Sequence, residues 1–164
     1  MKINICQAID SDLEELCGLY YELHEFHAKY LTAYLKSLGE PSGNDRVLLM
    51  DEIKRVINGS DSTILVAESA SQVIGLADIR INSPDPTNRG INPTPYAHLQ
   101  NLVVTQVYRR IGVGILLLQA AEDWSRARGV VDLTLDVWEF ADGPQEFYQK
   151  AGYRTFRHSL IKNI

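Results

Sequence analysis

The stretch LVVTQVYRRIGVG, residues 102–114, carries most of the structural information in this chain. Its apolar start predicts the end of a strand, two arginines follow in a loop, and Gly112 and Gly114 open a segment of helical periodicity. The first N–H groups of a helix lack internal partners and carry partial positive charge, and glycine lets an anion approach them closely. Together with Arg109 and Arg110, these groups predict a site for a pyrophosphate.

The spacing of this stretch excludes two other phosphate-binding motifs. A dinucleotide-binding fingerprint would need a third small residue at position 117, which is Leu117. A P-loop would need a Gly-Lys-Ser/Thr sequence, and the stretch contains none. The alternative, a surface loop whose glycines only permit tight packing, leaves the paired arginines without a role.

Hydrophobic patterns on both sides of this stretch predict alternating strands and helices. The predicted strands are 3–6, 63–67, 73–81, 98–104, 131–138 and 153–158. The predicted helices are 13–38, 47–57, 112–127 and 145–151. Residues 82–95 contain four prolines and predict a long surface loop, either a lid or a plain tip. This order of elements predicts one α/β domain over residues 1–164, with a mixed sheet.

Composition narrows the classes of function. A chain of 164 residues can bury a core without metal or disulfide staples, and Cys6 and Cys17 are expected to be reduced core thiols. The net charge of −5 argues against nucleic-acid binding, which needs a clustered surplus of Lys and Arg. Because no stretch approaches the ~18 apolar residues of a membrane span, we expect a cytoplasmic protein without membrane contact.

Residues 109–114 resemble the acetyl-CoA signature of the GNAT acetyltransferase superfamily, Gln/Arg-x-x-Gly-x-Gly/Ala. The resemblance extends upstream to the strand 102–104. Downstream, Phe147-Tyr148-Gln149-Lys150-Ala151-Gly152-Tyr153 is similar to the family's Phe-Tyr-x-x-x-Gly-Phe segment, and residues 136–140 resemble the strand before it. The matches occur in the expected order over about residues 98–158. They imply an α/β GNAT-like domain with a central mixed, mostly antiparallel twisted sheet of 6–7 strands, flanked by helices and splayed between strands 4 and 5.

The resemblance also implies acetyl-CoA as the co-substrate. Backbone groups of Leu102, Val103 and Val104 would pair with its pantetheine arm as if it were another strand. The residues implied to hold the pyrophosphate are Arg109, Arg110, Gly112, Val113 and Gly114. Ala141 is a departure, because relatives usually place there an Asn that helps to hold the pantetheine.

Acetyl transfer to an amine needs an acid and a base. Coenzyme A leaves as a thiolate, which a tyrosine hydroxyl can protonate, and by resemblance Tyr148 is the general acid; the alternative is that it only packs its helix on the sheet. Many relatives carry the base as a carboxylate on the strand before the loop, where this chain has His98-Leu99-Gln100-Asn101. Imidazole titrates near neutral pH, so His98 is the candidate base. A water relay into Asp78, Asp136 or Glu139 is the alternative.

The acceptor site is the least constrained part. By resemblance the first helices cover it, so we expect Tyr20, His24 and His27 to line it, with Gln100, which shares a strand face with His98 by alternation. His24 and His27 lack a third ligand at suitable spacing, so no metal is expected.

The predicted function is acetyl transfer from acetyl-CoA to a primary amine, by direct attack in a ternary complex. A small-molecule amine is the expected acceptor. The alternatives are a protein N-terminus or lysine, or a catalytically weak acyl-CoA-binding sensor. Members of the family are often homodimers, and the sequence leaves the oligomeric state open.

Overall fold

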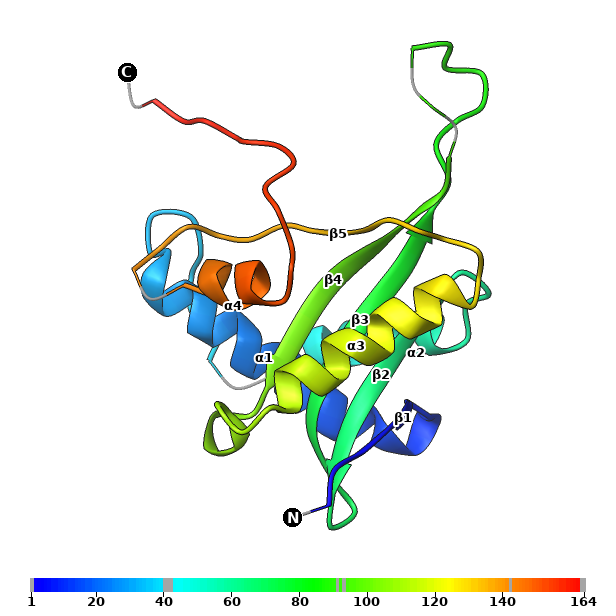
Figure 1. Ribbon diagram of the computed structural model, residues 1–164. Coiled ribbons are helices and arrows are strands. Elements are labelled where there is room, and N and C mark those ends of the chain that lie inside the picture. The colour runs from blue at the N-terminus through cyan, green and yellow to red at the C-terminus, as the bar shows by residue number, and fades with distance from the viewer. Residues whose placement is uncertain (1, 40–42, 91, 93, 142, 163–164) are drawn as a thin grey trace.

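A computed structural model describes residues 2–39, 43–90, 92, 94–141 and 143–162 of the protein. Within these residues, five strands form one sheet in the order β1-β2-β3-β4-β5 (Figure 1). The strands are β1 Asn4–Gln7, β2 Ser62–Ser69, β3 Gln72–Asn82, β4 Tyr96–Val104 and β5 Leu133–Leu135. Neighbours from β1 to β4 are antiparallel, whereas β5 is parallel to β4. The sheet is therefore mixed and mostly antiparallel, as predicted.

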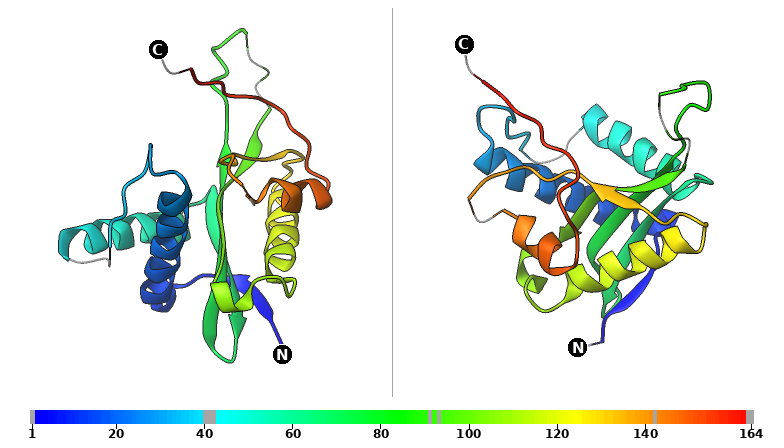
Figure 2. Two further views of the ribbon diagram at one scale, coloured as in Figure 1. Left: turned by 90° about the vertical axis from the view of Figure 1, so that its left-hand side faces the viewer. Right: turned by 45° about the horizontal axis from the view of Figure 1, so that its top comes forward.

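Helices cover both faces of the sheet. The helices are α1 Leu13–Tyr30, α2 Gly43–Ile57, α3 Val113–Arg126 and α4 Gln145–Lys150, with short 3-10 turns η1 Asp10–Asp12 and η2 Gln106–Tyr108. Figure 2 shows α1 and α2 on one face and α3 and α4 on the other. Because side chains alternate along a strand, β2 places Ile64 and Val66 against α1 and α2, and Leu65 and Ala67 against α3. Burial on both faces explains why this strand is continuously apolar.

The sheet has fewer strands than the six or seven predicted. The strand expected at 153–158 does not form: no strand in the described part of the chain pairs with it, and Phe156 is 81% exposed. A strand needs cross-strand contacts to be stable, and a run of β-favouring residues alone does not supply them. The strand expected at 131–138 is also shorter than predicted. Only the three residues of β5 find partners on β4, and Val131, which lies outside this pairing, is exposed.

The first helix also ends earlier than the predicted Leu38. Leu31 leaves the helical conformation, and the chain turns back along α1. Glu25 holds this turn, accepting hydrogen bonds from the Ser37 hydroxyl and the Leu38 backbone N–H, both at 2.7 Å. Residues 31–38 therefore have the apolar spacing of a helix but do not continue α1.

The predicted splay lies between β4 and β5. The two strands pair at Ala97↔Leu133, His98↔Thr134 and Leu99↔Leu135. Beyond Leu99, β4 continues to Val104 with no neighbour on that side among the described residues. On its other side β4 pairs with β3, and a bulge shifts the register so that Asn101 faces Asp78 and Leu99 faces Ile79. No helix in the described part of the chain is long and apolar enough to cross a membrane.

Candidate active site

A cavity of about 370 Å³ lies where the open end of β4 meets the start of α3. Its lining residues are Leu102, Val104, Arg109, Arg110, Gly112, Gly114, Ile115, Pro144, Phe147 and Tyr148. Most of the residues predicted to bind the cofactor therefore lie together. Val103 and Val113 are the exceptions, because their side chains are buried in the core, which leaves only their backbone groups to contribute.

The loop before α3 has the backbone geometry that its glycines allow. Gly112 is the N-cap of α3 in the left-handed region, with φ +94°, and Arg110 has φ +63°. Glycine adopts this conformation without the steric penalty that other residues incur. Two residues on, a Cβ on Gly114 would lie 3.4 Å from the Phe147 ring. Gly112 and Gly114 therefore place no side chain of their own between the start of α3 and the cavity.

The two arginines occupy different environments. Arg109 donates from Nε to the Val104 carbonyl at 2.8 Å and from Nη2 to Glu22 Oε1 at 3.0 Å, and its guanidinium lies over the Phe26 ring, 5.2 Å from the centroid. It thereby ties the loop to the end of β4 and to α1. Arg110 is exposed and forms no ion pair within the described residues. Arg109 has a structural role that the motif alone did not reveal.

Tyr148 lies on α4 and lines the same cavity. Its ring packs edge-on against Phe147, with centroids 5.0 Å apart. Burial raises the pKa of Tyr148 to about 12, so the hydroxyl stays protonated at neutral pH. Both of the roles left open for Tyr148, packing and chemistry, are compatible with this position.

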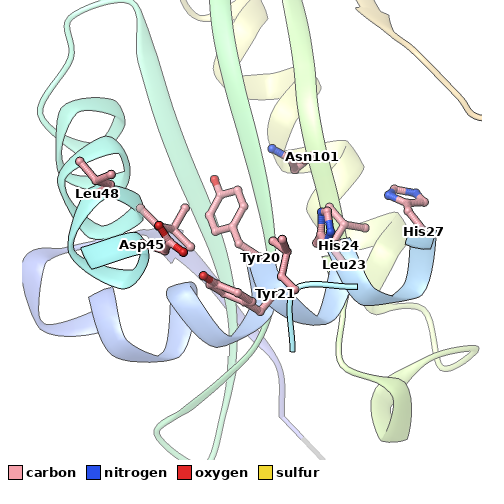
Figure 3. A pocket seen from close by; sticks show the side chains of 10 residues that line it. Tyr20, Tyr21, Leu23, His24, His27, Asp45, Leu48 and Asn101 are labelled. Atoms are coloured by element: carbon pink, nitrogen blue, oxygen red, sulfur yellow. The ribbon is translucent and has the colours of Figure 1, made fainter. Parts of the chain in front are cut away.

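A second cavity, of about 440 Å³, lies on the opposite face of the sheet, between α1, α2 and β4 (Figure 3). Its lining residues are Tyr20, Tyr21, Leu23, His24, His27, Leu38, Asp45, Leu48, Leu49 and Asn101. The structure thus brings Tyr20, His24 and His27 together in the lining of one cavity. Gln100 lies outside this lining, because the bulge in β4 breaks the alternation and turns Asn101 toward the cavity instead.

The two cavities are separated by the thickness of one strand. Asn101 lines the cavity on the α1 side and Leu102, the next residue of β4, lines the cavity on the α3 side. At this point β4 has no neighbour on the β5 side among the described residues.

The two helix histidines make different contacts. His24 Nε2 donates to the Lys36 carbonyl at 2.8 Å, which holds residues 31–39 against α1. Burial, and to a smaller extent the nearby His24, lowers the pKa of His27. Within the described residues no group of three or more metal-ligating side chains comes together.

His98 lies where β4 and β5 still pair, outside the lining of both cavities. The Thr134 hydroxyl donates to the Ala97 carbonyl at 3.2 Å and lies 2.9 Å from His98 Nδ1. Since the hydroxyl hydrogen is used on the carbonyl, its oxygen accepts from Nδ1–H. His98 Nε2 lies 3.8 Å from a carboxylate oxygen of Asp136.

Asp78 is a buried carboxylate behind the second cavity, with its side chain 1% exposed. Its Oδ2 accepts hydrogen bonds from the Tyr20 hydroxyl at 2.9 Å and from Asn101 Nδ2 at 3.3 Å. Burial and the Asp78 charge raise the pKa of Tyr20 well above its ordinary value. An acidic residue inside the apolar run 73–81 was the one signal in the sequence, but it did not indicate these partners.

The sequence model of the acetyltransferase (GNAT) family matches residues 20–153, which contain both cavities and all the residues that line them. The chain belongs to the acetyltransferase (GNAT) family. One relative in this family, the uncharacterized N-acetyltransferase YhfO of Bacillus subtilis (strain 168), is 26% identical over 151 residues, which cover 92% of this chain and 89% of YhfO.

Solved structures of this GNAT fold resemble the chain over nearly its full length. The tetramutant of the BH1408 protein from Bacillus halodurans superposes with a TM-score of 0.86 at 23% identity, covering 98% of this chain and 99% of that one. Aminoglycoside N-acetyltransferase AAC(6')-Iy in complex with CoA has a TM-score of 0.71 at 19% identity, and the match covers 99% of this chain and 95% of that one. The same enzyme with the bisubstrate analog CoA-S-monomethyl-acetylneamine has a TM-score of 0.72 at 20% identity, and the match covers 100% of this chain and 99% of that one.

Proposed function

We propose that the protein transfers an acetyl group from acetyl-CoA to a primary amine of a small molecule, by direct attack in a ternary complex. The observation that carries the proposal is the pair of cavities on opposite faces of β4, with Leu102 in one and Asn101 in the other. One cavity suits an anion and the other suits an amine. Their meeting at the open edge of β4 would let a thioester from one side contact a nucleophile from the other.

The α3-side cavity has the groups that a CoA pyrophosphate and pantetheine arm need. Arg110 and the N-terminal turn of α3 supply positive charge, and Gly112 and Gly114 leave the turn uncovered. The backbone of Leu102, Val103 and Val104 has no strand neighbour on the β5 side among the described residues, so a pantetheine amide could add there as a strand. CoA bound here would supply the activated acetyl group.

Tyr148 is the proposed general acid. When the amine nitrogen attacks the thioester carbonyl, the carbon–sulfur bond breaks and the thiolate needs a proton. The protonated Tyr148 hydroxyl in the same cavity can donate it.

His98 is the proposed base. Its Nδ1 is held by Thr134, which leaves Nε2 able to take a proton from the amine. The imidazolium formed would be stabilised by Asp136, whose carboxylate lies 3.8 Å from Nε2. His98 stands one residue before the point where β4 loses its β5 neighbour, so a water would carry the proton from the α1-side cavity.

The α1-side cavity favours a small, positively charged acceptor. Its lining includes Tyr20, Tyr21 and Asp45, and no Lys or Arg occurs among the described residues that line it. Aromatic faces and a carboxylate attract an ammonium group. Its volume of about 440 Å³ is in the range of small-molecule sites.

The test is acetyl-CoA binding by calorimetry, for wild type beside Arg110→Ala, followed by thiol release over a panel of amines. We expect binding that weakens in the variant, and thiol release with at least one small amine. Release only with peptides would instead favour a protein acceptor, and binding without release on any amine would favour a sensor. No acetyl-CoA binding would overturn the proposal.

A further inference from the structure

We propose that Asp78 is a positioning residue that makes the α1-side cavity selective for an ammonium group, by fixing the polarity of Tyr20 and Asn101. This inference rests on the proposed function in taking that cavity as the acceptor site. Asp78 itself lies behind the lining, whereas Tyr20 and Asn101 form part of it. Asp78 therefore acts through its two neighbours.

The argument begins with hydrogen-bond direction. An ionised carboxylate can only accept hydrogen bonds, so both neighbours must donate to it. The Tyr20 hydroxyl hydrogen is used on Asp78 Oδ2, which leaves only the lone pairs of the phenol oxygen for the cavity. Asn101 likewise turns its Nδ2 toward Asp78, so its carbonyl oxygen is the end left for other partners. Figure 3 shows the Tyr20 ring rising from α1 toward Asn101 on β4.

A site that presents only oxygen lone pairs selects a donor. An ammonium group has three N–H donors and no acceptor, whereas a hydroxyl or a neutral amide can do both. The raised pKa of Tyr20 keeps its hydroxyl protonated, so the direction of the Tyr20–Asp78 bond is maintained across physiological pH. Both presented oxygens are thus held as acceptors by the same carboxylate.

The charge of Asp78 is only partly balanced by its surroundings. Arg80 Nη2 is 3.6 Å from Asp78 Oδ2, and the same atom is 3.6 Å from Glu52 Oε1, so two carboxylates share one guanidinium. Asp78 Oδ1 has no hydrogen-bond partner among the described residues. A buried carboxylate with an unsatisfied oxygen costs free energy, and a cation at Tyr20 and Asn101 would offset part of that cost. Asp45 adds a second acidic group at the rim of the cavity.

The test is binding of amines alone, measured by calorimetry without acetyl-CoA. The probes are 1,4-diaminobutane, spermidine and tyramine, with 1,4-butanediol as the uncharged match for the first. Wild type should bind at least one amine and should not bind the diol. Asp78→Asn should weaken that binding about tenfold or more, because the amide no longer forces its neighbours to donate. Tyr20→Phe should weaken it by a similar factor.

Two controls separate selectivity from folding and from the proposed function. Tyr153→Phe removes a tyrosine–carboxylate hydrogen bond outside both cavities, from the Tyr153 hydroxyl to Glu122 Oε1 at 3.1 Å, and should bind amines as wild type does. Acetyl-CoA affinity should be unchanged in Asp78→Asn, which shows that the sheet is intact. The inference is overturned if no amine binds wild type, or if Asp78→Asn binds amine as wild type does. If the proposed function is wrong, wild type should instead fail to bind acetyl-CoA.

Discussion

Tyr148 and Tyr153 pack edge to face with ring centroids 5.9 Å apart, yet the structure uses their hydroxyls differently. The Tyr153 hydroxyl donates to Glu122 on α3 at 3.1 Å, which ties the chain after α4 to that helix. The Tyr148 hydroxyl makes no hydrogen bond within the described residues and belongs to the cavity next to the open edge of β4. The two tyrosines therefore form a matched pair for mutagenesis.

Tyr148→Phe should lower kcat by about 100-fold or more, the contribution expected of a general acid, and leave acetyl-CoA affinity nearly unchanged. Tyr153→Phe should keep kcat and lose stability by about 1 kcal/mol, because it removes one hydrogen bond. Thiol-release kinetics, calorimetry and urea melts of both variants make the comparison. Equal kcat in wild type and Tyr148→Phe would show that Tyr148 only packs.

Gly112→Ala and Gly114→Ala should separate backbone strain from cavity filling. Gly112 has φ +94°, so alanine there should cost about 1–2 kcal/mol in unfolding free energy. A methyl on Gly114 meets Phe147 at an ordinary 3.4 Å and projects into the cavity, so it should reduce acetyl-CoA affinity with little loss of stability. Melts and calorimetry on the pair test this, and unchanged affinity in Gly114→Ala would contradict the assignment of the cavity.

The two arginines should respond differently to substitution. Arg109→Lys retains the charge but cannot donate to Val104 and Glu22 in the same geometry, so it should lower both stability and acetyl-CoA affinity. Arg110→Ala should lower affinity alone, because Arg110 is exposed. The affinity loss in Arg110→Ala should shrink at high salt, where surface charges are screened. Calorimetry at two ionic strengths, with melts of each variant, distinguishes the two roles.

His98→Gln should lower kcat on an amine acceptor by about 100-fold, without loss of acetyl-CoA affinity. Thr134→Val should reproduce part of this loss, because it removes the oxygen that holds His98 Nδ1. Initial rates with a saturating amine give the measurement, and a folded His98→Gln variant with wild-type kcat would exclude His98 as the base.

Alkaline pH should destabilise the fold partly through Tyr148. Burial raises its pKa to about 12 from an ordinary value near 10, so the unfolded chain loses this proton first as the pH rises. The stability from the buried, neutral phenol is fully present below pH ~10 and is lost as the pH approaches 12. The free energy of unfolding should thus fall less steeply over this range in Tyr148→Phe than in wild type. Urea melts at several pH values test the difference, and identical slopes would contradict it.

Local sequence patterns were sufficient for the elements on either side of the loop before α3. Within residues 102–114, an apolar run predicts the strand end, a glycine at a left-handed position predicts the loop, and helical periodicity predicts the helix start. Each of these features is local, so the sequence alone reveals it. The same patterns over-predicted the strand at 153–158, since a strand also needs a partner that a local pattern cannot specify.

By itself, the sequence determined the family, the mixed α/β fold and the position of the glycine-containing loop before α3, because these depend on motifs whose residues are adjacent in the chain. Only the tertiary structure decided which residues line the α1-side cavity. The bulge in β4 turns Asn101, in place of the predicted Gln100, toward the cavity. The packing of α1 on β3 brings Tyr20 to Asp78, 58 residues away in the sequence. Contacts of this range follow from strand register and helix packing, which are set by the whole core and not by any single stretch.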